Sequence, residues 1–133
     1  MIRSFPLVIV IVLIDQLSKQ WVLSSLHEPW WFAEGVGFLR SLNEGIAFSI
    51  PLTGLPSILV TSSVVLVLFW FWRKKTTSGI LTTLCFSLII GGAIGNLIDR
   101  FRFGAVVDFI HIFSWPSFNV ADSAITVGFL LLI

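Results

Sequence analysis

The sequence predicts an all-α membrane protein with four transmembrane helices and both chain termini on the cytoplasmic side. Of its 133 residues, 56% are hydrophobic and only 11% are charged, and the mean hydropathy is +1.01. A soluble domain carries roughly 25% charged residues, so the main solvent of this chain is expected to be lipid. This composition argues against a disordered chain, a nucleic-acid-binding arm and an ordinary cytosolic enzyme. The length fits one integral membrane domain over residues 1–133.

Four apolar stretches approach the roughly 20 residues that a helix needs to cross the hydrocarbon core. They lie at about 5–23, 55–72, 79–98 and 118–133. The fourth carries Asp122 and falls somewhat short of a full span, which predicts a tilted helix or a chain that continues further. Arg3 followed by apolar residues would also suit a cleaved signal peptide. Because no small-x-small cleavage site follows Ile14, this stretch is predicted to be the first helix.

The basic residues of the short loops predict the orientation, because Lys and Arg are retained on the cytoplasmic side. The densest basic cluster lies at 73–75, between the second and third stretches, and Arg3 lies near the amino terminus. Both termini are therefore predicted to be cytoplasmic. The longer connections at 24–54 and 99–117 are predicted to be extracytoplasmic, and tryptophans near both faces are typical of aromatic belts.

Charged residues in or beside a spanning helix are costly, and they are functional candidates by default. Asp15 and Lys19 lie four residues apart on one helical face, which predicts a local ion pair that braces a nearby site. In the third stretch, a strip of glycines shares a face with Asn96 and Asp99. Helix packing is the simpler explanation for the glycines. Arg100 follows Asp99 directly, so capping and a salt bridge at the helix end compete with catalysis there.

Three carboxylates are predicted to meet at the outer membrane edge. Asn119 and Asp122 share a face at the start of the fourth stretch, and Asp108 lies in a short run, 106–112, that fits an extended segment or an inserted helix. Two carboxylates held close in a low-dielectric site share one proton, so one acts as a base toward water and the other as an acid toward a carbonyl. The pattern is typical of an aspartic protease. Spacing alone leaves open which two of Asp99, Asp108 and Asp122 form the pair.

Other chemistries have weaker support in the sequence. Cys85 lies in the middle of an apolar stretch, and His27 and His111 have no obvious nucleophile beside them. Asp108 and His111 are three residues apart, but two isolated histidines are a weak metal signal, so neither a metal nor another cofactor is predicted. The net charge of +1 gives no basic footprint for nucleic acid.

Five short motifs, in order along the chain, resemble those of the lipoprotein signal peptidases (signal peptidase II), the membrane aspartic proteases of bacteria. They are Asp15-Gln16-Leu17-Ser18-Lys19, Asn43-Glu44-Gly45-Ile46-Ala47-Phe48, the segments Gly92 to Arg100 and Gly104 to Phe109, and Phe118-Asn119-Val120-Ala121-Asp122. Each motif alone would be a weak signal. Five of them in order within a four-span chain are highly specific.

The resemblance implies that Asp108 and Asp122 form the catalytic dyad. It also implies supporting or substrate-positioning roles for other polar or small residues of the motifs: Asp15, Lys19, Asn43, Gly45, Asn96, Asp99, Arg100 and Asn119. A small extracytoplasmic β-like cradle and a loop would be formed by residues near 24–54.

The implied substrate is a prolipoprotein whose cysteine already carries diacylglycerol, cut just before that cysteine. The implied location is the bacterial cell (inner) membrane, with the active site toward the extracytoplasmic face. The expected partners are these substrates and membrane lipid, without nucleic acid. The protein is expected to act as a monomer.

Two other classes of protein are alternatives. Four spans and intramembrane acids also suit a small proton- or ion-coupled transporter. A carrier should hold its acid near the bilayer midplane, whereas the acids here gather at one edge beside a long outer connection. A structural membrane subunit is the third alternative, and in that case asparagine would replace Asp108 and Asp122 without loss.

Overall fold

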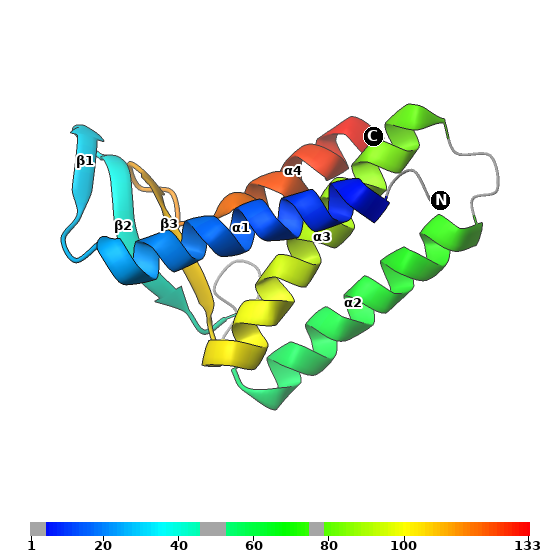
Figure 1. The fold of residues 1–133 in the computed structure, drawn as a ribbon, viewed down its shortest axis with the longest axis horizontal. Coiled ribbons are helices and arrows are strands. Elements are labelled where there is room, and N and C mark those ends of the chain that lie inside the picture. The colour runs from blue at the N-terminus through cyan, green and yellow to red at the C-terminus, as the bar shows by residue number, and fades with distance from the viewer. Residues whose placement is uncertain (1–4, 46–52, 75–78) are drawn as a thin grey trace.

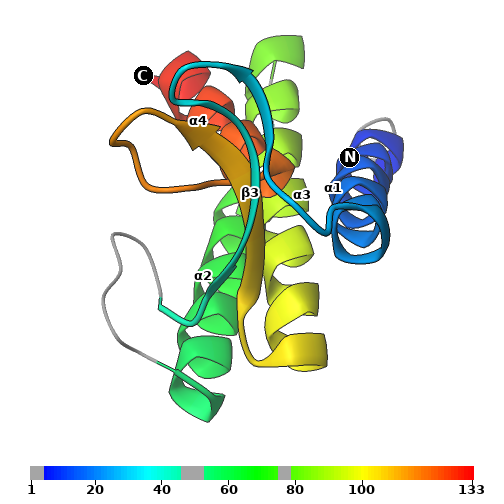
Figure 2. The same cartoon turned by 90° about the vertical axis from the view of Figure 1, so that its left-hand side faces the viewer.

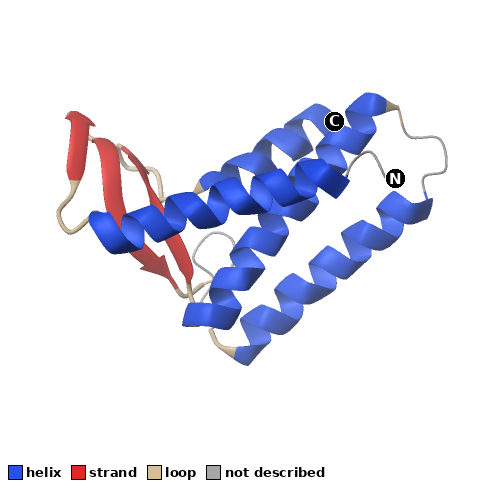
Figure 3. Ribbon diagram, viewed as in Figure 1, coloured by secondary structure: helices blue, strands red, loops and turns tan. Residues whose placement is uncertain are grey.

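The computed structural model describes residues 5–45, 53–74 and 79–133, and within them the chain forms four helices and one three-stranded sheet (Figure 1, Figure 3). The helices are α1 (Phe5–Ser25), α2 (Leu55–Lys74), α3 (Ile80–Phe103) and α4 (Val120–Leu132), and the strands are β1 (Trp30–Ala33), β2 (Val36–Asn43) and β3 (Val106–Ile112). The sheet gathers at one end of the helices. The protein is therefore mostly helical rather than purely α.

Three of these helices are long and apolar enough to cross a membrane. The mean hydropathies of α1, α2 and α3 reach 1.6, 2.0 and 1.9, whereas α4 is apolar but has only 13 residues. Most leucine, valine and aromatic side chains of α2 are exposed on the protein surface. A helix that is hydrophobic all round is typical of a membrane span, so this exposure is expected where lipid covers the surface.

Helix α3 packs against α1, α2 and α4 and forms the centre of the helical part. Glycines allow this close approach. A Cβ at Gly91 would press on α1, and a Cβ at Gly92 would overlap the backbone of Ala121 in α4. Gly95 leaves room for the carboxylate of Asp15. The glycine strip of α3 therefore packs against neighbouring helices as expected, and it brings α1 and α4 to the same part of α3.

The sheet joins two segments that are far apart in sequence. Its order is β1-β2-β3, antiparallel throughout, with β2 before α2 and β3 after α3. Figure 2, which looks at this end of the molecule, shows β3 beside α3. Residues 106–112 are thus a strand, one of the two forms that the sequence left open. The β-like cradle expected from residues 24–54 contains β1 and β2, and it is completed by a third strand, β3, which follows α3 in the chain.

A small apolar cluster fixes the sheet to the end of α1. Val107 and Phe109 of β3 pack with Val22 and Leu26 of the chain around the end of α1. Because side chains alternate along a strand, the residue between Val107 and Phe109 points to the opposite face. That residue is Asp108, which is buried and directed toward the start of α4.

Helix α3 extends further than the apolar stretch that predicted it. It runs through Asp99 and Arg100 to Phe103, and Gly104 ends it with a left-handed φ of 72°. The N–H of Gly104 donates to the carbonyl of Arg100, a common way to close a helix. Asp99 and Arg100 therefore lie about one turn inside the helix. The sequence had indicated that they lie at the helix end, and the structure corrects this.

The ends of the helices agree with the predicted topology where the chain is described. Helix α1 begins and α4 ends at the end of the molecule away from the sheet (Figure 1). Arg73 and Lys74 lie in the last turn of α2, toward that same end. Two other parts of the prediction lie outside the described residues, namely the basic residues Arg3 and Lys75 and the second-motif residues 46–48.

Candidate active site

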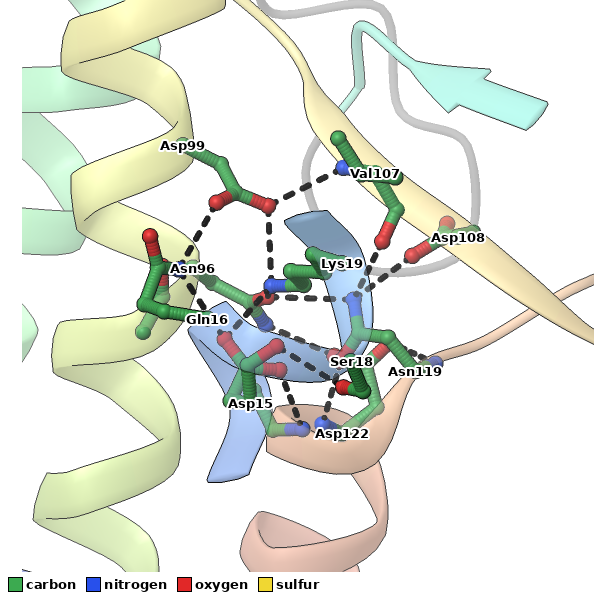
Figure 4. A network of polar contacts seen from close by, with 12 residues as sticks. Asp15, Gln16, Ser18, Lys19, Asn96, Asp99, Val107, Asp108, Asn119 and Asp122 are labelled. Atoms are coloured by element: carbon green, nitrogen blue, oxygen red, sulfur yellow. Dashed lines mark hydrogen bonds and ion pairs between the residues drawn. The ribbon is translucent and has the colours of Figure 1, made fainter. Parts of the chain in front are cut away.

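The predicted site residues come together where the sheet meets the helices (Figure 4). They come from five elements and the segments beside them: Asp15 and Lys19 from α1, Asn43 and Gly45 from the end of β2, Asn96, Asp99 and Arg100 from α3, Asp108 from β3, and Asn119 and Asp122 from the start of α4. Polar side chains buried in an apolar protein must satisfy one another. Among the described residues, every buried side-chain nitrogen and oxygen has a hydrogen-bond partner.

Asp108 is held by two neutral amide groups. Its Oδ2 accepts from Nδ2 of Asn43 at 3.1 Å, and its Oδ1 accepts from Nδ2 of Asn119 at 2.7 Å. The residue is only 2% exposed. Burial, followed by the nearby charge of Asp122, raises the pKa of Asp108 to about 6. A carboxyl group with this pKa is able to keep or lose a proton near neutral pH.

Asp122 is held in a similar way from the other side. Its Oδ1 accepts from Nδ2 of Asn96 at 2.7 Å, and its Oδ2 accepts from the backbone N–H of Asn119 at 3.3 Å. Asp122 is the third residue of α4 and Asn119 is its N-cap, so the second contact is half of a capping box. The helix terminus thereby fixes the direction in which the Asp122 carboxylate points.

Asn119 contacts both carboxylates. Its side-chain Oδ1 accepts from the N–H of Asp122 at 2.9 Å, while its Nδ2 donates to Asp108. The same Nδ2 lies 3.2 Å from Oδ1 of Asn96 and 3.3 Å from the carbonyl oxygen of Val107. One fully buried amide therefore links β3, α3 and α4 at the point where the two acids meet.

Asp99 is set apart from these two acids by its partner. Lys19 Nζ lies 2.8 Å from Asp99 Oδ2 and 2.8 Å from Asp15 Oδ2, and all three side chains are at most 2% exposed. The ion pair predicted between Asp15 and Lys19 is confirmed and has a second acid. The expected salt bridge of Asp99 is made with Lys19, whereas Arg100 donates to the carbonyls of Gly45 and Asn96.

The four acids of this network fall into two kinds, according to whether a cation or neutral amides contact the carboxylate. Asp15 and Asp99 share the buried ammonium group of Lys19. Among the described residues, the hydrogen-bond donors to Asp108 and Asp122 are neutral amides. The charge of Asp122 acts directly on Asp108. The choice that sequence spacing left open among three acids is thus narrowed by the position of Lys19.

One polar residue of this network had no role assigned from the sequence. Gln16 Nε2 donates to Asp99 Oδ1 at 2.9 Å, to Asp15 Oδ2 at 3.2 Å and to the carbonyl of Gly95 at 3.2 Å. Its Oε1 lies 3.4 Å from Nη1 of Arg102. The sequence signal was a second polar residue beside Asp15 in a spanning helix, but its partners on α3 are not visible from local spacing.

Gly45 connects the end of the sheet to α3. Its N–H donates to Oδ1 of Asn43 at 3.0 Å, and its carbonyl accepts from Nη2 of Arg100 at 3.0 Å. These bonds orient the amide of Asn43 so that its Nδ2 faces Asp108.

Among the described residues, no three His, Cys, Asp or Glu side chains are arranged to hold a metal ion.

Comparisons with known proteins match nearly the whole chain. The model of the family "Signal peptidase (SPase) II" matches residues 7–133. The chain is 43% identical to the lipoprotein signal peptidase of Syntrophotalea carbinolica over 133 residues, covering 89% of this chain and 80% of the relative. It is 38% identical to the lipoprotein signal peptidase of Shewanella baltica (strain OS195), covering 99% of this chain and 84% of the relative. A bacterial membrane enzyme solved by the in meso method at 2.3 Å resolution has a TM-score of 0.89 and 28% identity, covering 100% of this chain and 86% of the other.

Long apolar helices with paired carboxylates at one end define the class of membrane-embedded aspartic peptidases. Peptidases of this class use two acids that share a proton. The chain belongs to the signal peptidase II family, the lipoprotein signal peptidases, which remove signal peptides from prolipoproteins. The family resemblance read from the five motifs is therefore confirmed, and the transporter and structural-subunit alternatives are rejected.

Proposed function

We propose that Asp108 and Asp122 are the catalytic dyad with which the protein cleaves prolipoproteins. The observation that carries this proposal is the set of neutral donors around both carboxylates, with Asn119 bonded to each. In this environment, one proton shared by two acids is more stable than two charges. Asp99 is not a candidate in this proposal, because its Oδ2 already forms a buried ion pair with Lys19 at 2.8 Å.

The dyad performs hydrolysis with one carboxyl group ionised and the other protonated. The ionised carboxylate removes a proton from a water molecule, whose oxygen forms a bond to the scissile carbonyl carbon. The protonated carboxyl group donates its proton to the carbonyl oxygen as the tetrahedral intermediate forms. As the C–N bond breaks, the protonated carboxyl group gives its proton to the leaving amine, and a hydroxyl of the tetrahedral intermediate gives its proton to the other carboxylate as the carbonyl re-forms. The pair then again holds one proton.

The substrate of this proposal carries a diacylglyceryl cysteine, and the cut falls just before it. The lipid anchors the scissile bond at the membrane edge, which converts a lateral encounter into an oriented one. Trp30 and Trp31 lie on β1, the outer strand of the sheet, and are about half exposed, as suits an element that rests on the membrane interface. Asn43 and Arg100, at the edge of the dyad, position the substrate backbone.

The proposed topology places this site on the extracytoplasmic face of the bacterial cell (inner) membrane. Helix α4 completes the fourth crossing, and both chain ends are cytoplasmic. The basic residues Arg73 and Lys74 at the end of α2 support this orientation, because such residues are retained on the cytoplasmic side. Protease accessibility of an epitope placed in the β1–β2 turn, compared in intact cells and inverted vesicles, tests it.

Cleavage is expected to require the lipid on the substrate. Detergent-purified protein is mixed with a lipobox peptide whose cysteine carries diacylglycerol and, separately, with the same peptide without lipid. Only the lipidated peptide is expected to be cut, just before the cysteine, as measured by mass spectrometry of the products. Equal cleavage of both peptides would contradict the proposed substrate, and cleavage of neither by folded protein would contradict the proposed activity.

The rate is expected to fall at both low and high pH. Below the lower apparent pKa of the pair both carboxyl groups are protonated and no base remains, whereas above the higher one both are ionised and no acid remains. Since the pKa of Asp108 is raised to about 6, the basic limb of kcat/KM is expected to begin near pH 6. The measurement is kcat/KM for the lipidated peptide between pH 4 and 9 at constant ionic strength. A flat profile over this range would argue against a shared proton.

A further inference from the structure

Lys19 uses all three of its ammonium hydrogens inside the protein. Its Nζ lies 2.8 Å from Asp15 Oδ2, 2.8 Å from Asp99 Oδ2 and 3.0 Å from Asn96 Oδ1, and the side chain is 2% exposed. An ammonium group has three donors and no acceptor. Its position is therefore fixed by three acceptors from α1 and α3 (Figure 4).

Each acid bound to Lys19 also holds the backbone beside a dyad aspartate. Asp15 Oδ1 accepts from the N–H of Ala121 at 2.9 Å, and Ala121 directly precedes Asp122. Asp99 Oδ2 accepts from the N–H of Val107 at 3.1 Å, and Val107 directly precedes Asp108. The two buried acids therefore make equivalent contacts with α4 and β3, and Lys19 joins them.

The third contact of Lys19 determines which way an amide faces. Asn96 Oδ1 accepts from Lys19, and this leaves Nδ2 of Asn96 to donate to Asp122 Oδ1 at 2.7 Å. If this amide turned by half a rotation, its NH₂ group would face the ammonium and its oxygen would face a carboxylate. Both contacts would then be repulsive. Lys19, together with Nδ2 of Asn119 at 3.2 Å from the same oxygen, therefore keeps the donor of Asn96 directed at Asp122.

We infer that Lys19 is a positioning residue that sets the placement of Asp108 and Asp122 relative to one another, through Asp99, Asp15 and Asn96. The inference rests on the proposed dyad and adds to it a single group on α1 that connects to both acids. The competing explanation is a structural role, in which Lys19 only neutralises two buried carboxylates so that the helices pack.

Charge and position have different consequences for the pH profile. The ionisable groups that face this region are Asp15 on α1, Asp99 and Arg100 on α3, Asp108 on β3 and Asp122 on α4. Burial and the charge of Asp122 raise the pKa of Asp108, and the positive charge of Lys19 opposes this rise. Removing Lys19 alone should therefore move the rate profile to higher pH.

The test combines two substitutions that cancel in charge. Lys19→Met removes the cation and keeps a long side chain, but it leaves two buried acids without a counter-charge and is expected to lower the thermal midpoint. Lys19→Met with Asp99→Asn removes one positive and one negative charge, so the net charge of the region is unchanged. At position 99 the amide oxygen still accepts from the N–H of Val107, whereas its NH₂ group faces Nε2 of Gln16, so the Gln16 amide must turn to keep that contact; Asp99→Asn alone carries the same change. Asp99→Asn alone is the reference for this pair.

Thermal midpoint, kcat and KM for the lipidated peptide are measured at each variant's own pH optimum. The double variant is expected to keep the pH optimum of the wild type, because the two have the same net charge in this region, and to regain most of the thermal midpoint lost in Lys19→Met. Its kcat is expected to stay about 100-fold below that of Asp99→Asn, with little change in KM. Equal kcat values in these two variants would overturn the inference and leave Lys19 as a neutralising charge. A double variant that does not fold would also overturn it, because the role of Lys19 would then be structural.

Two controls separate this inference from the dyad proposal. Lys74→Met removes an exposed lysine at the far end of α2 and should leave kcat unchanged. Asp108→Asn tests the dyad without altering the contacts of Lys19. If Asp108→Asn retains activity, the dyad proposal fails whatever the Lys19 variants show. If Asp108→Asn is inactive, and Asp99→Asn has the same kcat with and without Lys19→Met, only the positioning role of Lys19 fails.

Discussion

Replacing Asp108 or Asp122 by asparagine is expected to abolish cleavage while leaving folding and membrane insertion intact. Asparagine has nearly the volume of aspartate but cannot bind or release the shared proton. Without that proton site, the dyad lacks either its base or its acid at every pH. Loss of a residue that acts as part of a catalytic unit typically removes at least ~10,000-fold of the rate. Cleavage of the lipidated peptide by each purified variant measures the loss.

A matched control uses an acid outside the network. Glu34→Gln makes the same change of charge and chemical group in the exposed turn between β1 and β2. It should retain wild-type kcat. Circular dichroism and the thermal midpoint report whether each variant is folded. Full activity of a folded Asp108→Asn or Asp122→Asn variant would remove that residue from the dyad.

Substitution of Asn119 is expected to have the next largest effect, because its side chain donates to the carboxylate of Asp108 and accepts from the backbone N–H of Asp122. Asn119→Ala removes the donor to Asp108 and the cap of α4. Loss of one preorganised donor in a buried active site costs about 100-fold in kcat or more. Loss of an N-cap costs about 1 kcal/mol of stability. Both kcat and the thermal midpoint are therefore expected to fall.

Serine at position 119 separates the two roles. Asn119→Ser keeps an oxygen that can cap the helix, but it has no amide to donate to Asp108. Its thermal midpoint is expected to stay close to wild type while kcat falls nearly as far as in Asn119→Ala. If the serine variant regains the activity as well as the stability, capping alone would explain the importance of Asn119.

The helices could be predicted from the sequence because a membrane span is a local signal. About 20 apolar residues in a row are sufficient, and the stretches near 55–72 and 79–98 needed no information from the rest of the chain. The sheet depends on pairing between β2 and β3, which lie on either side of two helices. Local spacing contains no signal for that pairing, so residues 106–112 remained ambiguous. Helix α4 was predicted as a stretch of 118–133, and Asn119 as its N-cap sets the start at Val120.

The site shows the same division between local and distant contacts. The Asp15–Lys19 pair follows from a spacing of four residues on a helix, and the structure contains it. The second acid on Lys19 comes from α3, and the contacts of Gln16 also cross between helices. The assignment of supporting roles came from the family resemblance. What these residues touch could be learned only from their arrangement in space.

The pairing of β2 with β3 imposes an order on biogenesis. The two strands flank α2 and α3 in the chain, so they can meet only after these helices have entered the bilayer as a hairpin. Asn43 reaches Asp108 only at that stage, and Asp122 follows Asp108 in the chain and is synthesised after it. Non-local pairing of this kind forms late because its loop must close first. A chain that has not yet added β3 and α4 therefore lacks Asp108 and Asp122, so the site is complete only once all of these elements are in place.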